Sequence, residues 1–325
     1  MNLKQKVLSF LENNRGESVS GGKIATELGV TRSAVWKAIK SLQDEGYSIE
    51  AVTNKGYCLS KENDILSVES IKPYIEKLEN KLDIIVLKTV DSTNNYAKTL
   101  AQQGAKEGTI IISEEQTAGK GRLGRKFYSP ASSGICMSII VRPKMSIQKS
   151  LMITTATAVI VSKAIEKISY LSTEIKWVND IYAQGKKLCG ILTEASIDCE
   201  TGGLEYAIVG IGINVSTVKD SFPDDIKDIA TSIYPHQQVR PIRSALIGEI
   251  LTQFFNELES FGEGVHMSEY RQRSMLIGEE INVISADKIT PAHVIDIDDD
   301  AKLIVRYENG EISELSSGEV SVRKK

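Results

Sequence analysis

The hydrophobic pattern changes character twice along the chain, and this change constrains the fold more than any other feature. Residues 1–62 carry helical spacing and then two short alternating runs, whereas residues 276–325 carry only alternating runs, with turns at Asp298–Ala301 and Asn309–Gly310. One sheet or one helical bundle does not accommodate both patterns, and 325 residues suffice for two or three domains of about 100–200 residues. We therefore predict three domains, over residues 1–62, 63–275 and 276–325.

The long middle segment mixes the two kinds of pattern. Strand-like runs cover residues 84–87, 109–113, 134–141 and 206–215, and helical patterns cover residues 147–168 and 242–261. No apolar run approaches the ~18 residues of a membrane span, and the first 14 residues have amphipathic helical spacing rather than the apolar core of a signal peptide. We therefore expect a cytoplasmic protein that does not interact with membranes.

The first segment has the spacing of a small helical unit followed by a hairpin. Apolar residues at Ile24–Leu28 mark a short helix, Gly29 is placed to end it, and a second helix is expected over about Arg32–Glu45. The runs Ile49–Val52 and Tyr57–Leu59 flank a tight turn and predict two paired strands. Helix, glycine turn, helix and hairpin together are the layout of a winged helix-turn-helix, which places its second helix in the major groove of DNA.

The second of these helices carries residues suited to DNA contact, and Ser33 is also its expected N-cap. Nine lysines and arginines against seven acidic residues give this segment a charge of +2, although the whole chain has −4. Such a charge supports only weak binding by a monomer, so we expect a dimer on a two-fold site. A helical adaptor with a solvated charged face is the alternative. The candidate DNA-binding residues are Gly22, Thr31, Arg32, Ser33, Trp36, Lys37, Lys40 and Lys55.

The most unusual stretch of the middle segment is residues 119–127, in which three glycines and four cationic side chains share nine positions. Glycine allows the backbone to approach a ligand closely, and the cations suit a phosphate or a carboxylate. The stretch lacks the Walker pattern of P-loop proteins. A basic surface loop, or one that binds nucleic acid, is equally compatible with this composition alone.

Other polar motifs flank strands. Asp91–Asn95 follows a strand and opens a helix, and Lys176–Ile181 with Lys186–Glu194 predicts a hairpin around the turn at Gln184–Gly185. Asn179 and Asp180 by themselves also fit an ordinary hairpin turn. Gly210–Asn214 lacks the third glycine of a dinucleotide-binding fingerprint. Four cysteines without C-x-x-C spacing and three scattered histidines argue against a zinc site and a disulfide framework.

These motifs, in this order and spacing, resemble those of the biotin–protein ligases, and the N-terminal segment resembles that of the bifunctional ligases that also repress biotin operons. The resemblance implies an α+β multidomain fold: an N-terminal winged helix-turn-helix, a central mixed-sheet α/β ligase domain like that of class II synthetases and lipoate ligases, and a C-terminal small SH3-like β-barrel. Three positions depart from the common family pattern: Lys120 replaces arginine, Val178 replaces proline and Phe127 replaces tryptophan.

The resemblance also implies an activity and partners. The family forms biotinyl-5′-AMP from biotin and ATP with Mg²⁺, and then transfers biotin to a lysine of a biotin carboxyl carrier protein. The bifunctional members bind operator DNA as ligand-promoted homodimers, with biotinyl-5′-AMP as corepressor. A lipoate or octanoate ligase is the alternative enzyme, and a repressor that senses a small acid is the alternative without catalysis. Release of pyrophosphate separates the enzymes from the sensor.

The resemblance assigns roles to individual residues. Lys187 and Arg122 are the catalytic candidates, Asp180 is a candidate Mg²⁺ ligand, and Glu319 matches a position that faces the nucleotide. The expected biotin-binding residues are Ser92, Thr93, Asn94, Gln116, Gly119, Lys120, Gly121, Arg122, Lys187, Gly190 and Leu192. The expected ATP-binding residues are Arg122, Arg125, Phe127, Lys176, Asn179, Asp180, Lys187, Asn214 and Arg323.

Overall fold

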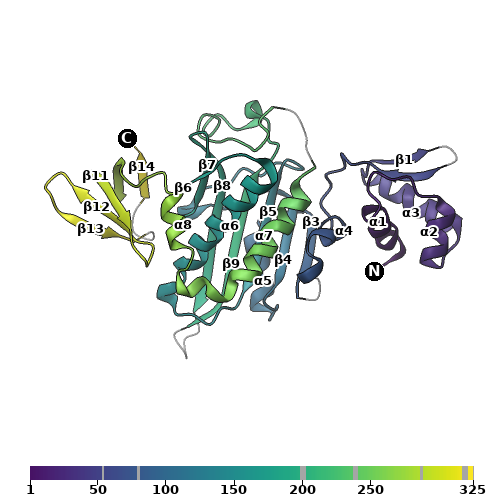
Figure 1. The fold of residues 1–325 in the computed structure, drawn as a ribbon, viewed down its shortest axis with the longest axis horizontal. Helices are drawn as coiled ribbons and strands as arrows, with labels where there is room; N and C mark the ends of the chain where they lie inside the picture. Colours follow the sequence, from purple (N-terminus) through teal and green to yellow (C-terminus); the bar gives the residue numbers. More distant parts are fainter. Residues whose placement is uncertain are drawn as a thin grey trace.

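Three sheets follow one another along the molecule in this computed structural model, one in each of the three predicted segments (Figure 1). The structure describes residues 1–52, 55–78, 81–197, 203–236, 241–285, 288–316 and 321–324. The N-terminal and C-terminal units lie at opposite ends of the long axis, with the seven-stranded sheet between them. The exact domain boundaries, after residues 62 and 275, stay a prediction. Across the described residues, no helix is both long and apolar enough to cross a membrane.

The N-terminal unit has the predicted order of elements: α1 (Leu3–Glu12), α2 (Gly21–Leu28), α3 (Arg32–Asp44), β1 (Ile49–Val52) and β2 (Gly56–Leu59). Gly29 ends α2 in the left-handed conformation, at φ 65°. The expected cap of α3 was wrong: Thr31, and not Ser33, is the N-cap, and its hydroxyl accepts from the backbone N–H of Ala34. Strands β1 and β2 pair antiparallel, as the hairpin pattern predicts.

The central unit is built on a mixed sheet in the order β3-β4-β5-β9-β8-β7-β6, in which β3 and β4 pair parallel and the other neighbours pair antiparallel. Its strands are β3 (Asp83–Val90), β4 (Thr109–Gln116), β5 (Gly134–Val141), β6 (Glu174–Lys176), β7 (Asp180–Ala183), β8 (Lys186–Ile197) and β9 (Leu204–Asn214). Its helices are α4 (Val68–Ile71), α5 (Thr93–Gln102), α6 (Leu151–Ser169), α7 (Arg243–Glu257) and α8 (Met267–Gln272). The four predicted strands and two predicted long helices all occur; the strand over residues 134–141 matches β5 at both ends, and the other elements have at least one shifted end.

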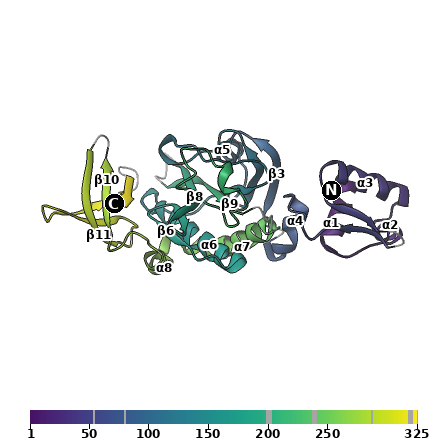
Figure 2. The same cartoon turned by 90° about the horizontal axis from the view of Figure 1, so that it is seen from above.

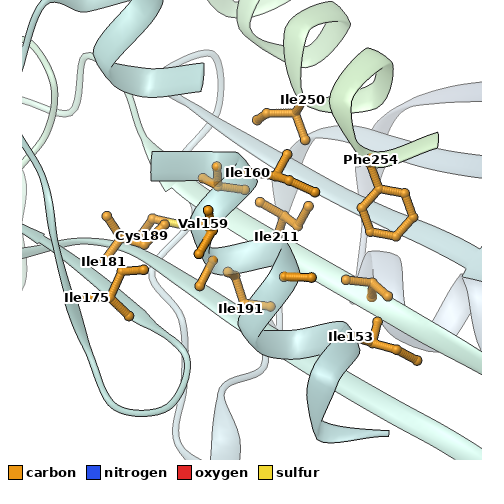
Figure 3. Packing of buried hydrophobic residues seen from close by; sticks show 14 of the residues in the cluster. Ile153, Val159, Ile160, Ile175, Ile181, Cys189, Ile191, Ile211, Ile250 and Phe254 are labelled. Atoms are coloured by element: carbon orange, nitrogen blue, oxygen red, sulfur yellow. The ribbon is translucent and has the colours of Figure 1, made fainter. Parts of the chain in front are cut away.

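Apolar side chains cover both faces of this sheet. Helices α6 and α7 lie on one face and α5 lies on the other (Figure 2). Helix α6 is buried on nearly all sides because it packs between the sheet and α7: Ile153 and Ile160 contact a cluster that includes Ile191 and Ile211 of the strands and Ile250 of α7 (Figure 3). The opposite face holds a smaller cluster around Ala97 and Ala101 of α5. The sheet is therefore a rigid platform for the loops at its ends.

A buried ion cluster attaches the segment after the N-terminal unit to this platform. Arg243 at the start of α7 is 1% exposed, and its guanidinium forms ion pairs with Asp64 and with Glu114 of β4, each at 2.7 Å. Glu114 also accepts from the backbone N–H of Leu66 at 2.7 Å. The two carboxylates and one guanidinium therefore hold residues 64–66 against the strand that ends at Gln116.

The C-terminal unit is a small antiparallel sheet in the order β13-β12-β11-β10-β14. Its strands are β10 (Glu280–Ser285), β11 (Lys288–Ile297), β12 (Leu303–Tyr307), β13 (Ile312–Leu315) and β14 (Ser321–Lys324). The indole N–H of Trp177, in the central unit, donates to the backbone oxygen of Ala301 at 2.8 Å. Trp177 is 5% exposed and contributes to the core, although it also borders the cavity described below.

Candidate active site

A cavity of about 590 Å³ opens in the central unit between β7, β8, β9 and the loop after β4. It brings together residues that the sequence separates by more than a hundred positions. The predicted ligand residues that line it are Ser92, Thr93, Asn94, Gln116, Lys120, Gly121, Arg122, Arg125, Phe127, Lys176, Asn179, Asp180, Lys187, Gly190, Leu192 and Asn214. The size and the mixed lining are those of a small-molecule site.

Three predicted residues are not among the described residues that line the cavity: Gly119, Glu319 and Arg323. Gly119 is buried at the base of the loop and does not line the cavity; a Cβ there would lie 2.4 Å from the backbone oxygen of Phe127, so only glycine fits. Arg323 belongs to β14, where its backbone pairs with Asn282, but its side chain lies outside the described part of the structure. Glu319 also lies outside the described residues.

One end of the cavity carries the cations. Nζ of Lys187 on β8 lies 2.7 Å from Oδ1 of Asp180 on the adjacent strand β7, and both side chains are partly exposed to the cavity. Nη1 of Arg122, in the glycine-rich loop, donates to Oδ1 of Asn179 at 3.1 Å. Burial lowers the pKa of the Arg122 guanidinium from its ordinary value; the nearby negative charge of Asp180 opposes this shift, and the positive charge of Arg125 adds to it. This end of the cavity is thus prepared for an anion, which would compensate these charges.

The loop itself lies over a floor of two glycines. Gly190 and Gly212 are cross-strand partners on β8 and β9, and the ring of Phe127 lies against both. A Cβ on Gly212 would lie 2.6 Å from Cε1 of this ring. The backbone N–H of Phe127 donates to the oxygen of Gly119 at 2.9 Å, which closes the base of the loop. The glycines therefore make room for an aromatic side chain inside the cavity.

The start of α5 and the end of β4 line the cavity with the neutral polar side chains of Ser92, Thr93, Asn94 and Gln116. The backbone N–H and the hydroxyl of Thr93, at the start of α5, both approach Oε1 of Gln116, at 2.8 and 3.1 Å. Nε2 of Gln116 donates to Oγ of Ser129 at 3.0 Å, and Ser92 is the N-cap residue of α5. Neutral donors and acceptors held in fixed directions suit a neutral polar head group.

Sequence reasoning missed several residues of this site. Ser138 on β5 and Glu194 on β8 bond to the side chains of Thr93 and Asn94, and residues 222–230 supply a wall of the cavity. The wall segment also supports β8, because the backbone N–H of Lys187 donates to the oxygen of Ile229 at 2.8 Å. One signal was available: Ser138 is the only hydroxyl in the apolar run Ile135–Val141.

Six of the eight candidate DNA-binding residues lie on α3 or at its N-cap, whereas Gly22 lies on α2 and Lys55 in the turn of the hairpin. These six, from Thr31 to Lys40, are exposed, and Trp36 keeps 55% of its surface in solvent. Arg32 lies against Gly22 of α2, where a Cβ would be 2.8 Å from Nη2 of its guanidinium. Lys55 is exposed in the turn that precedes β2. Helix α3 thus presents a polar, cationic face with an aromatic side chain in it.

Comparison with known proteins agrees with this architecture. A family model described as "Biotin/lipoate A/B protein ligase family" matches residues 86–214, an "HTH domain" matches residues 4–58, and a "Biotin protein ligase C terminal domain" matches residues 276–323. Among solved structures, the biotin protein ligase from Aquifex aeolicus in complex with biotin and ATP superimposes with a TM-score of 0.64 at 29% identity, over 75% of this chain and 99% of that one. The fold and site thus define a ligase of the biotin/lipoate class joined to a DNA-binding domain.

Full-length relatives narrow this class. The chain is 34% identical over 323 residues to the bifunctional ligase/repressor BirA of Bacillus spizizenii, which covers 98% of both proteins. It is 27% identical over 321 residues to the protein of the same name from Escherichia coli, over 98% of this chain and 96% of the relative. The chain belongs to the family of bifunctional biotin–protein ligases and repressors.

Proposed function

We propose that this protein condenses biotin with ATP to biotinyl-5′-AMP and pyrophosphate, and transfers the biotinyl group to a lysine of a biotin carboxyl carrier protein. The single observation that carries this proposal is the cavity itself, which joins a neutral polar end at Thr93 and Gln116 to a cationic end at Arg122 and Lys187. Biotin has the same two ends, a neutral ureido head and a carboxylate tail.

The first step needs the cationic end. The biotin carboxylate must approach the α-phosphate, and two like charges at 4 Å repel by ~1 kcal/mol in water and ~4 kcal/mol at an effective dielectric of 20. Lys187 and Arg122 both line the cavity, and their positive charges offset this repulsion and the charge that develops on the phosphate oxygens. Lys187 is the main electrostatic catalyst, and Arg122 holds the carboxylate and phosphate together.

The remaining cavity residues serve the nucleotide. Phe127 offers a ring for the adenine, and Lys176, Asn179 and Asn214 line the same cavity. Asp180 is the one acidic side chain among the described residues that line the cavity. Mg²⁺ is typically coordinated by one or two carboxylates, with phosphate oxygens and water as its other ligands. Asp180 and the ATP phosphates together are therefore suitable ligands for Mg²⁺.

The N-terminal unit extends the proposal to transcription. We propose that it binds operator DNA of biotin genes through α3, as a homodimer that biotinyl-5′-AMP promotes, and that the protein works in the cytoplasm. The exposed cationic face of α3 supports DNA binding, and the free thiols of Cys58, Cys136 and Cys189 suit a reducing compartment.

The direct test is to mix the protein with biotin and MgATP and to measure pyrophosphate and biotinyl-5′-AMP. We expect both products in equal amounts, and a much lower rate with lipoate, whose head lacks ureido N–H groups. Faster turnover of lipoate would indicate a lipoate ligase, and binding of biotin without pyrophosphate release would indicate a sensor. Either result would overturn the proposed activity.

A further inference from the structure

We infer that Ser138 and Glu194 are positioning residues for biotin, which fix the donor and acceptor directions of Thr93 and Asn94 although neither lines the cavity. This inference rests on the proposed function. Thr93 and Asn94 both border the cavity, whereas Ser138 is 0% exposed behind them. The two positioning residues therefore act on a ligand only through the side chains that they hold.

The backbone prepares a slot for the Asn94 side chain. Ser138, Gly210 and Leu192 form one row across β5, β9 and β8, because Gly210 is the cross-strand partner of both. A Cβ on Gly210 would lie 2.2 Å from Oδ1 of Asn94, so the amide occupies the space that a side chain would fill. The amide thus lies between the hydroxyl of Ser138 and the backbone of Leu192.

The contacts in this slot determine which way the amide points. Nδ2 of Asn94 donates to Oε2 of Glu194 at 2.7 Å and faces the oxygen of Leu192 at 3.3 Å. A carboxylate and a carbonyl oxygen only accept, so Nδ2 belongs on this side and Oδ1 belongs on the side of Ser138. Oγ of Ser138 lies 2.7 Å from that Oδ1. Because an amide oxygen has no proton, the Ser138 hydroxyl must donate to it.

This assignment in turn fixes the hydroxyl of Thr93. Oγ of Ser138 also lies 2.8 Å from Oγ1 of Thr93, but its single proton is already committed to Asn94. The Thr93 proton therefore goes to Ser138 or to Oε1 of Gln116, 3.1 Å away. The oxygen of Thr93 is then left as an acceptor at the cavity, which is the partner that a ureido N–H requires.

The test is Ser138→Ala in the full-length protein. We expect the Kd and KM for biotin to rise about tenfold, which corresponds to ~1.4 kcal/mol and to the loss of one buried hydrogen bond. The KM for ATP, and kcat at saturating biotin, should change less than twofold. The affinity for lipoate should stay unchanged, so the preference for biotin over lipoate should fall about tenfold. A purely structural role would weaken both acids alike.

Ser162→Ala is the matched control. Ser162 of α6 is also 0% exposed, and its Oγ has no hydrogen-bond partner within the described part of the chain. This variant should bind biotin as the wild type does. Equal biotin affinities for the Ser138→Ala and Ser162→Ala proteins would overturn the inference, as would parallel losses for biotin and ATP in Ser138→Ala.

Exchanging the hydrogen-bond donor and acceptor between positions 94 and 194 tests Glu194 independently. This experiment also keeps the inference testable if the Ser138→Ala protein does not fold. Asn94→Asp places two carboxylates at contact distance and should weaken biotin binding at least tenfold. In the double variant Asn94→Asp with Glu194→Gln, the new glutamine donates an N–H to the new aspartate. Its affinity for biotin should return most of the way to the wild-type value. Absence of recovery would overturn the inference. A wild-type protein that does not bind biotin would instead overturn the proposed function, so the two failures are distinguishable.

Discussion

Lys187 is the residue on which the proposed chemistry depends most. Its Nζ shares one end of the cavity with Asp180, at 2.7 Å, and β8 holds it there. We predict that Lys187→Ala lowers kcat for pyrophosphate release by about 10²–10³-fold, the usual cost of removing one preorganised electrostatic contact. The KM for biotin should change much less, because in the proposed function Thr93 and Gln116, rather than Lys187, hold the ureido head. Initial rates of pyrophosphate release over a range of biotin concentrations give both kcat and the KM for biotin.

Lys186→Ala provides the control, because it removes the same charge from the neighbouring position of β8, where the side chain does not line the cavity. This variant should keep wild-type kinetics. The catalytic assignment would be wrong if Lys187→Ala turned over at the wild-type rate, or if both variants lost the same activity.

Residues of this site differ in how far the sequence reveals them. The loop around Arg122 stands out because three glycines and four cationic side chains share nine positions, whereas Asn179 and Asp180 by themselves also fit an ordinary hairpin turn. Ser138 and Glu194 do not stand out, because their partner Asn94 lies 44 and 100 residues away. Such contacts exist only after β5, β8 and β9 have paired. A single polar residue in an apolar strand does not indicate which distant residue it will contact.

At the scale of elements, the sequence predicts the existence of a helix or strand better than its ends. Helix α3 was predicted over Arg32–Glu45 and ends at Asp44, but its cap was assigned to the wrong hydroxyl. Oγ of Ser33 lies only 3.0 Å from Oγ1 of Thr31, so both hydroxyls are in place. Thr31 is the cap because its backbone is extended, at φ −82° and ψ 153°. Composition does not distinguish two capping residues that lie only two positions apart.

Helix α3 also carries a prediction about DNA. Lys37 is exposed on it, and we expect Lys37→Ala to weaken binding to random-sequence duplex DNA and to reduce the slope of log K against log salt by about one. Fluorescence anisotropy across a series of salt concentrations measures this slope. Lys149→Ala removes an exposed charge from the central unit and should leave the slope unchanged. A wild-type affinity that does not depend on salt would contradict DNA binding through this face.

At the scale of the whole molecule, the buried Arg243 cluster holds the connection between the first two units. Arg243→Met leaves the carboxylates of Asp64 and Glu114 buried without their partner, a change that costs ~3–5 kcal/mol in comparable sites. We predict a clearly lower Tm and faster hydrogen exchange at the backbone N–H of Leu66, which bonds to Glu114. Lys167→Met breaks the exposed pair with Glu249 and should cost at most ~1 kcal/mol. Equal Tm values for the two variants would contradict a holding role for Arg243.

We expect catalysis and DNA binding to be linked through the ligand that occupies the cavity. A domain of charge +2 supports only weak DNA binding by a monomer, and we therefore propose that the protein represses as a dimer whose formation depends on the ligand in the cavity. If biotinyl-5′-AMP favours the dimer, operator DNA must favour the liganded dimer by the same free energy. Sedimentation velocity should show a monomer without ligand and a dimer with biotin and MgATP.

The Lys187→Ala protein distinguishes the substrates from the adenylate as the signal for dimerisation. It should stay monomeric with biotin and MgATP, which it converts slowly, but it should dimerise when biotinyl-5′-AMP itself is added. Identical sedimentation of the wild type in all three conditions would contradict a ligand-controlled dimer, and dimerisation of Lys187→Ala by biotin and MgATP alone would show that the substrates, rather than the adenylate, are the signal.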